Sequence, residues 1–226
     1  MDRQSHWNRV YETKELNEVS WYQRSPERSL FYIRKFSEPS QQVIDVGAGA
    51  SPLVDSLIDE GYVRPIILDI SPVGLDRSKA RLGALAKLVH WVVADVTADV
   101  VLPMVNVWHD RATFHFLTDP ADRANYARLA GRTLRPAGYL IIATFAPDGP
   151  KRCSGLPVQQ HDGKSIGSLF DDEFEFVEEA REVHVTPAGA EQPFSWSILR
   201  RRVGEIRRPR RSSIPAPMSS QQDGGA

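Results

Sequence analysis

The sequence predicts an α/β fold: a doubly wound, mostly parallel seven-stranded sheet with helices on both faces and an antiparallel pair of closing strands. Three observations support this prediction. A short apolar run, residues 43–46, passes through a glycine turn directly into a helix start. Further apolar runs then alternate with helical patterns up to residue 145, and two runs of alternating polarity follow. Strands that alternate with helices form a parallel sheet, because each crossover connection is right-handed.

The N-terminal residues 1–36 are predicted to form a helical, aromatic segment before the first strand. Residues 26–36 carry apolar side chains at helical spacing with basic residues on the other face, which predicts a helix there. Trp21, followed by Tyr22, is a candidate lid residue, because an aromatic ring can stack on or cap a flat or cationic ligand. The alternative is that these aromatic residues only cover the edge of the sheet.

The first predicted strand, Val43–Val46, ends in a turn that contains Gly47 and Gly49. Without a Cβ, these residues allow a sharp turn and a close approach of a ligand to the main chain. Ser51 is a good N-cap and Pro52 suits the first helical turn, so a helix is predicted over residues 52–60.

This turn differs from a dinucleotide site, which requires the pattern G-x-G-x-x-G. Pro52 stands where the third glycine should be, and Asp45 would repel a pyrophosphate. A nucleotide-dependent oxidoreductase is therefore disfavoured. A ligand with a cationic ammonium or sulfonium group would suit Asp45.

Two further strands, at 64–70 and 90–96, each run into a carboxylate, with a helix predicted between them over 72–88. Asp69 lies 24 residues after Asp45, close to the ~20-residue offset at which an acidic residue meets the ribose hydroxyls in nucleotide folds. Asp95 ends the third strand. The carboxyl ends of parallel strands meet at one edge, so the three acids should line it. The alternatives are a helix cap for Asp69 and an exposed loop for Asp95.

The remaining elements follow from polarity patterns and turn residues. They are a fourth strand at 105–111, a helix at 121–134, a turn at 135–138, a fully buried strand at 139–145, a loop at 146–166, and two closing strands at 174–184 and 192–201.

The D-x-G-x-G pattern of residues 45–49 resembles the first motif of the class I S-adenosylmethionine-dependent methyltransferases. Acids at the ends of the second and third strands and the Leu-Arg-Pro-Ala-Gly turn at 134–138 are also typical of this family. The resemblance covers residues 37–203. It implies S-adenosylmethionine as the cofactor and S-adenosylhomocysteine as its product. The implied cofactor-binding residues are Asp45, Gly47, Ala48, Gly49, Asp69, Ile70, Asp95, Val96 and, from the lid segment, Trp21.

The segment after the fourth strand faces the methyl acceptor in this family. Residues 108–112 resemble the Trp-Asp-Arg-Gly and Asp-Lys-Gly variants of thiopurine and some protein-lysine methyltransferases, with Ala112 in place of glycine. The Asn/Asp-Pro-Pro-Tyr box used on DNA bases or glutamine is absent. His109 is a candidate base because imidazole titrates near neutrality. Asp110 is a candidate for orienting the acceptor; the alternative is a structural ion pair of Asp110 with Arg111.

The expected function is in-line transfer of a methyl group from S-adenosylmethionine to a small molecule or a protein side chain. The small molecule is slightly favoured, because the loops are short and the folded part is acidic. The alternatives are a protein-lysine methyltransferase specifically, or a module that binds the cofactor without catalysis.

Composition limits the remaining possibilities. The chain has 226 residues, a net charge of −1 and one cysteine, and its six histidines show no metal-ligand spacing. No signal peptide or membrane-length apolar run is present, so a cytoplasmic monomer or dimer is expected. Residues 200–226 carry a charge of +5 and the other 199 residues carry −6. Residues 204–226 are expected to be a disordered basic tail, and nucleic acid is not expected as a partner.

Overall fold

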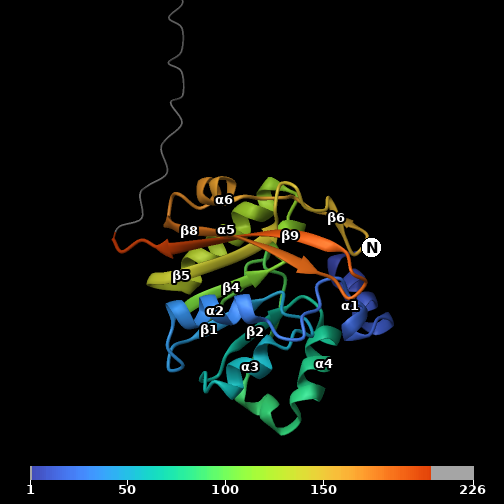
Figure 1. Cartoon of the computed structure of the whole chain (residues 1–226). Coiled ribbons are helices and arrows are strands. Elements are labelled where there is room, and N and C mark those ends of the chain that lie inside the picture. Colours follow the sequence, from blue (N-terminus) through green and yellow to red (C-terminus); the bar gives the residue numbers. More distant parts are fainter. Residues whose placement is uncertain (1, 205–226) are drawn as a thin grey trace, which may run out of the picture.

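The computed structural model describes residues 2–204 and contains a seven-stranded sheet in the order β3-β2-β1-β4-β5-β9-β8 (Figure 1). The first five strands pair in parallel, β9 runs antiparallel to β5, and β8 runs antiparallel to β9. The predicted architecture, with its antiparallel closing pair, is confirmed. The strands are β1 (Val43–Val46), β2 (Ile66–Asp69), β3 (His90–Val93), β4 (Val105–Arg111), β5 (Leu134–Phe145), β8 (Phe174–Val185) and β9 (Glu191–Arg201).

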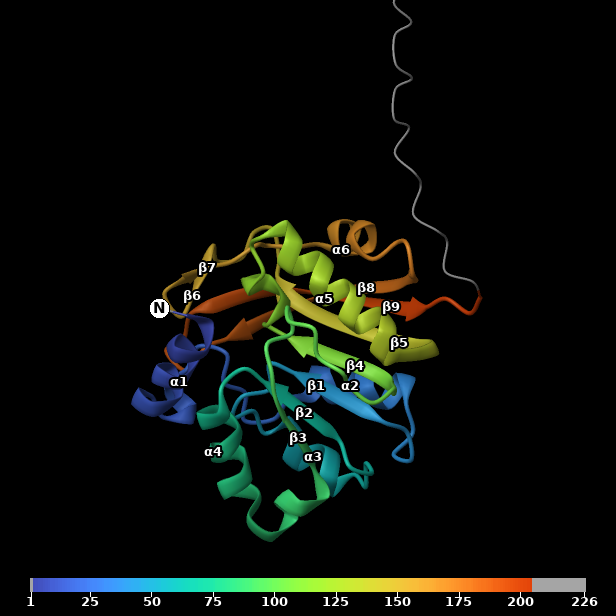
Figure 2. The ribbon, with the colours of Figure 1, turned by 180° about the vertical axis from the view of Figure 1, so that it is seen from behind.

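Helices cover both faces of the sheet (Figures 1 and 2). On one face, α5 (Pro120–Thr133) and α6 (Gly163–Leu169) pack on Trp108 and Ile142. On the other, α2 (Glu27–Phe36) and α3 (Leu53–Asp59) pack on Val107 and Trp196, and α4 (Pro72–Leu82) packs on Ile67. The central strands β1 and β2 are therefore buried on both faces, as expected for parallel strands between two helical layers, whereas the edge strands β3 and β8 are partly exposed.

Two short elements lie near the carboxyl ends of the strands. Helix α1 (Arg3–Thr13) and the 3₁₀ turn η1 (Leu16–Glu18) precede α2, and α1 packs against α4. A hairpin of β6 (Arg152–Cys153) and β7 (Leu156–Pro157) follows β5. These two elements are candidates for covering whatever binds at that edge.

The structure corrects several predicted boundaries. The helix predicted over 72–88 ends at Leu82, because Gly83 adopts a φ of +55° and a 3₁₀ segment follows over Gly83–Leu88. Strand β3 stops at Val93 rather than continuing to residue 96. The turn predicted at 135–138 is instead an irregular part of β5, where the pairing with β4 shifts register.

The loop predicted at 146–166 also contains regular structure. The β6–β7 hairpin is closed by Ser154 and Gly155, both at positive φ. Asp162 then caps α6 together with Ser165 in a reciprocal capping box. The sequence patterns of this hairpin turn and of this helix cap are both short. A helix of seven residues is not stable alone, and α6 is held in place by its contacts with β8 and β9.

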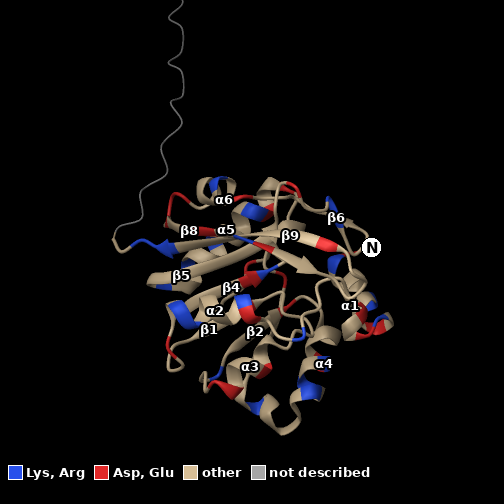
Figure 3. Cartoon of the chain, viewed as in Figure 1, with Lys and Arg blue, Asp and Glu red and all other residues tan. Residues whose placement is uncertain are grey.

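Acidic and basic residues are distributed over most elements of the described chain (Figure 3). No helix within residues 2–204 has the length and apolarity needed to cross a membrane. Of the tail predicted at 204–226, only Gly204 is within the described residues, so the prediction of disorder stays untested.

Candidate functional site

Two adjoining cavities lie at the carboxyl ends of the parallel strands. The first has an empty volume of about 850 Å³, partly open to solvent, and the second about 560 Å³. Four residues separate the two cavities and line both: Tyr11 of α1, Trp21 before α2, Gly47 in the turn after β1, and Arg111 of β4.

The glycine turn is packed tightly between two side chains. Gly47 has a φ of +66° and Gly49 a φ of +50°, a region that favours glycine. A Cβ on Gly47 would overlap the hydroxyl of Thr113, and one on Gly49 would overlap the hydroxyl of Tyr11. Gly47 lines both cavities, whereas Gly49 lines neither. Gly49 therefore serves the fold of the turn, and Gly47 is the glycine that a ligand can approach.

Asp69 lies at the end of β2 and lines the first cavity. Its carboxylate oxygens accept hydrogen bonds from the backbone N–H groups of Gly49 (2.8 Å) and Ser71 (2.7 Å). Burial raises the pKa of Asp69 to about 6, although these hydrogen bonds act in the opposite direction. Each carboxylate oxygen keeps an unused lone pair, so Asp69 can accept further hydrogen bonds from a ligand.

The other predicted residues of this edge occupy the same wall. Ile70, Asp95 and Val96 line the first cavity, and Ala48 lines the second. One Asp95 oxygen accepts from the N–H (2.8 Å) and the hydroxyl (2.7 Å) of Thr97. Its other oxygen lies 3.6 Å from Nη1 of Arg3. The hydrogen bonds from Thr97 thus fix the Asp95 side chain, and its other oxygen faces α1.

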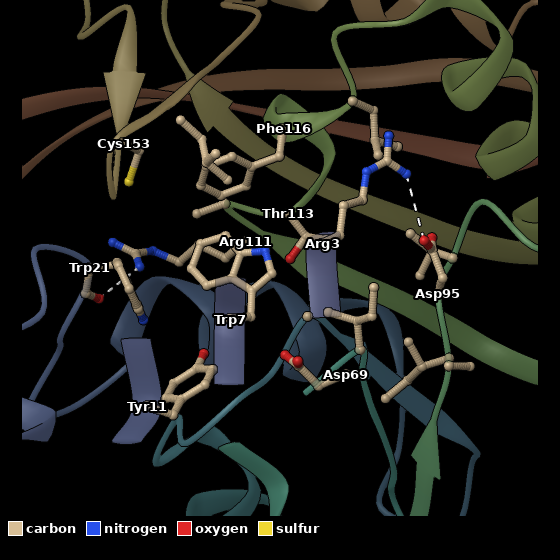
Figure 4. A pocket seen from close by; sticks show the side chains of 18 residues that line it. Arg3, Trp7, Tyr11, Trp21, Asp69, Asp95, Arg111, Thr113, Phe116 and Cys153 are labelled. Carbon is tan, nitrogen blue, oxygen red and sulfur yellow. Dashed lines mark hydrogen bonds and ion pairs between the residues drawn. The ribbon is translucent and has the colours of Figure 1, made fainter. Parts of the chain in front are cut away.

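Helix α1 covers the first cavity with residues spaced four apart. Arg3, Trp7 and Tyr11 share one helix face and all line the cavity (Figure 4). Arg3 also forms an ion pair with Asp122, and Gln4 donates to the carbonyl of Ile70 (2.9 Å). The i, i+4, i+8 spacing of these residues is a sequence pattern that could have grouped them on one helix face. That this face lies over the first cavity is seen only in the structure.

Trp21 completes this cover and lines both cavities. The edge of its ring contacts Trp7, which in turn contacts Phe116 after β4, with ring centroids 5.8 Å and 4.9 Å apart. This placement is compatible with the predicted lid role of Trp21.

Asp45 and His109 face each other across the β1–β4 pairing at the second cavity. Nδ1 of His109 lies 2.7 Å from Oδ1 of Asp45, and both side chains are buried. Because an ionised carboxylate only accepts hydrogen bonds, a neutral His109 donates from Nδ1. Nε2 of His109 is buried and has no partner among residues 2–204. This nitrogen is therefore available as a hydrogen-bond acceptor.

Asp110 does not lie at either cavity, which argues against the predicted contact with the acceptor. Its side chain points to the opposite face of the sheet, where it accepts hydrogen bonds from the Tyr126 hydroxyl (2.7 Å) and the backbone N–H groups of Thr113 (2.9 Å) and Phe114 (3.1 Å). Asp110 thus holds the turn after β4. Its supposed ion pair with Arg111 is also absent from the structure, because adjacent strand residues face opposite sides.

Ala112 occupies a position where the resembling motifs have glycine. It lines the first cavity and adopts a φ of +72°, in the left-handed region. The backbone turn that glycine would favour is therefore retained with an alanine.

Within residues 2–204, no group of three histidine, cysteine, aspartate or glutamate side chains could hold a metal ion. The thiol of Cys153 is buried in the wall of the first cavity, and burial raises its pKa. This makes the reactive thiolate form less accessible.

The chain is similar in structure to several solved methyltransferases. One is a SAM-dependent methyltransferase from Anabaena variabilis (TM-score 0.69, 15% identity, covering 88% of this chain and 93% of that one). Another is the N-methyltransferase NodS from Bradyrhizobium japonicum, in complex with S-adenosylhomocysteine (0.65, 14%, 87% and 98%). A third is the 1,6-didemethyltoxoflavin-N1-methyltransferase of Burkholderia thailandensis, with 1,6-didemethyltoxoflavin and S-adenosylhomocysteine bound (0.62, 18%, 86% and 81%).

No protein-family model matches the chain, and no curated protein matches it in sequence. At these low identities the structural likeness defines the fold. The chain has the Rossmann-like fold of the class I S-adenosylmethionine-dependent methyltransferases, as the D-x-G-x-G resemblance implied.

Proposed function

We propose that this protein is an S-adenosylmethionine-dependent methyltransferase that acts on a small molecule. The observation that carries the proposal is that two adjoining cavities at the carboxyl ends of the parallel strands are lined by Asp45, Gly47, Asp69 and Asp95, residues that the family motifs select. NodS and the 1,6-didemethyltoxoflavin-N1-methyltransferase bind S-adenosylhomocysteine on this fold.

The residues of the first cavity fit the cofactor. Asp69 is buried with unused lone pairs at the end of β2, which suits two vicinal ribose hydroxyls. Asp95 and Val96 line the same cavity and would meet the adenine ring, and Gly47 offers bare main chain between the cavities. S-adenosylmethionine would supply a methyl group already activated by a sulfonium centre.

The protein's own contribution is to align the acceptor and exclude water. Trp7, Trp21 and Phe116 form an aromatic wall over the first cavity. Asp45 holds the Nδ1 proton of His109, which leaves Nε2 to take a proton from an acceptor amine or hydroxyl. The partial cover of the first cavity by Arg3, Trp7 and Trp21 favours a small acceptor over the side chain of a folded protein.

The affinity for S-adenosylhomocysteine is expected to fall as the pH drops below about 6. Protonation of Asp69, whose pKa is raised to about 6, converts an acceptor oxygen into a donor and weakens its bonds to the ribose hydroxyls. Charged hydrogen bonds of about 1.5–3 kcal/mol correspond to a loss of roughly 10- to 100-fold. Calorimetric titrations between pH 5 and 8 measure this.

Asp69→Asn should bind weakly at every pH and show no such step. The pKa of Asp110 is also raised to about 6, but Asp110 lies away from the cavities. Asp110 still titrates in Asp69→Asn, so this variant shows whether its protonation affects the affinity for S-adenosylhomocysteine. A step of equal size in Asp69→Asn would remove Asp69 from the ribose site.

Two measurements test the proposed activity itself. Calorimetry should show tight binding of S-adenosylhomocysteine and none of a nicotinamide dinucleotide; the reverse result would favour the oxidoreductase. Radiolabelled methyl donor should then label a small-molecule extract rather than a protein lysate. Label in lysate proteins would instead favour a protein-lysine methyltransferase, and binding without any turnover would favour a non-catalytic module.

A further inference from the structure

Arg111 is half-buried and places a positive charge in the wall shared by the two cavities. Its Nη1 donates to the carbonyl of Trp21 (3.2 Å), and its guanidinium carbon lies 4.7 Å from the ring centre of Phe194. Nε and Nη2 are both buried and have no hydrogen-bond partner among residues 2–204. Two donors of the guanidinium are therefore unused.

A buried guanidinium normally lies against a carboxylate or phosphate, because leaving its charge unpaired away from water is costly. The carboxylate whose charge acts most on Arg111 is that of Glu182, and one of its oxygens accepts a hydrogen bond from Nε1 of Trp196 (2.8 Å). Burial lowers the pKa of Arg111 to about 10, so the side chain stays charged at neutral pH. Nε and Nη2 therefore remain able to bind the anionic group of a molecule in the cavities.

The position of Arg111 indicates which molecule this is. Figure 4 shows the guanidinium beside Cys153 at one side of the first cavity, with Asp95 at the other. Asp95, which suits the adenine ring, is thus at the far side of the cavity from Arg111, and Asp69 lies between them. Cys153 belongs to the β6–β7 hairpin that follows β5, and the aromatic rings of Trp7 and Phe116 line the space between. An anion at Arg111 lies beside this wall, where an acceptor would sit.

We propose that the methyl acceptor is an anionic small molecule whose carboxylate, or comparable oxyanion, binds Nε and Nη2 of Arg111. A flat, apolar body would lie along the aromatic wall. Two parallel N–H donors match a planar carboxylate bidentately. This inference rests on the proposed methyltransferase function. Because Arg111 also lines the second cavity, the carboxylate of the cofactor's methionine part is the competing source, and the experiment separates the two.

The first test divides a small-molecule extract on an anion exchanger before the reaction. Label from the radioactive methyl donor should enter the retained, anionic fraction and not the flow-through. With that fraction, Arg111→Met should lower kcat/KM by about 10- to 100-fold, the range for a charged hydrogen bond. Arg111→Lys should lose less, and the affinity of both variants for S-adenosylhomocysteine should stay within about twofold of the wild type.

Label in the flow-through alone overturns the proposal. So does a loss of S-adenosylhomocysteine affinity in Arg111→Met when the affinity for 5′-methylthioadenosine, which lacks the amino-acid part, is unchanged. In that case the anion belongs to the cofactor. Failure of wild-type protein to bind S-adenosylhomocysteine at all would instead reject the proposed function.

A second test needs no turnover. Without ligand, Arg111→Met should melt about 2–4 °C higher than the wild type, because a buried, unpaired charge is removed. Sodium benzoate, compared with benzamide at equal ionic strength, should raise the melting temperature of the wild type and not that of Arg111→Met. A lower melting temperature for Arg111→Met, together with no benzoate effect on the wild type, would make Arg111 a structural residue and overturn the proposal.

Discussion

Gly47→Ala is expected to destabilise the protein by roughly 2–5 kcal/mol and to abolish measurable binding of S-adenosylhomocysteine. The left-handed backbone at φ +66° costs an alanine about 1–2 kcal/mol. The added Cβ must also displace Thr113, whose Cβ lies 2.7 Å away, at a typical overpacking cost of about 1–3 kcal/mol. Thr113 would lose its hydrogen bond to the Val46 carbonyl, and the turn between the cavities would move. Chemical denaturation and calorimetry measure the two effects.

Gly61→Ala is the matched control. Gly61 also has a positive φ, +81°, but a Cβ there meets nothing within 4 Å. This variant should show the backbone cost of about 1–2 kcal/mol alone and bind S-adenosylhomocysteine normally. If Gly47→Ala is no worse than Gly61→Ala in stability and binding, the close packing of the turn does not matter to the site.

His109→Gln is expected to lower the rate of methyl transfer by about 10²–10⁴-fold, the usual contribution of a positioned acid or base. The side chain lies at the second cavity with Nδ1 bound to Asp45 and Nε2 unpartnered among the described residues. S-adenosylhomocysteine affinity should change little, because the residues that suit its adenosine line the other cavity. Single-turnover assays with radiolabelled donor and the active small-molecule fraction measure the rate.

Asp45→Asn tests how His109 acts. The amide can donate as well as accept a hydrogen bond, so it no longer fixes the proton on Nδ1, and the rate should fall in the same direction. His90→Gln, at an exposed position that begins β3, should be inert. An unchanged rate in His109→Gln would show that His109 is structural.

Sequence patterns identified most of the fold because most strands and helices have clear apolar periodicity and are bounded by turn residues. The glycine turn after residues 43–46 and the apolar run at 139–145 report local geometry and burial directly. Helix α6 and the β6–β7 hairpin were missed, because a helix of seven residues and strands of two are held by tertiary contacts rather than by their own propensities.

Some residues of the candidate site could likewise be predicted from the sequence, and others could not. Asp69, Asp95 and Gly47 could be chosen from their places at strand ends, because parallel strands bring those ends to one edge. Asp110 was also chosen, but the two-residue period of a strand puts it on the face opposite His109 and Arg111, away from both cavities.

The order of strands and helices and the chemistry at the strand ends follow from local periodicity and turn residues, so they can be predicted from the amino-acid sequence. Three features are seen only in the folded chain: Asp45 pairs with His109, α1 covers the first cavity, and Nε and Nη2 of Arg111 are buried with no hydrogen-bond partner among residues 2–204. These features depend on which side chains from distant segments meet, and no local pattern encodes that.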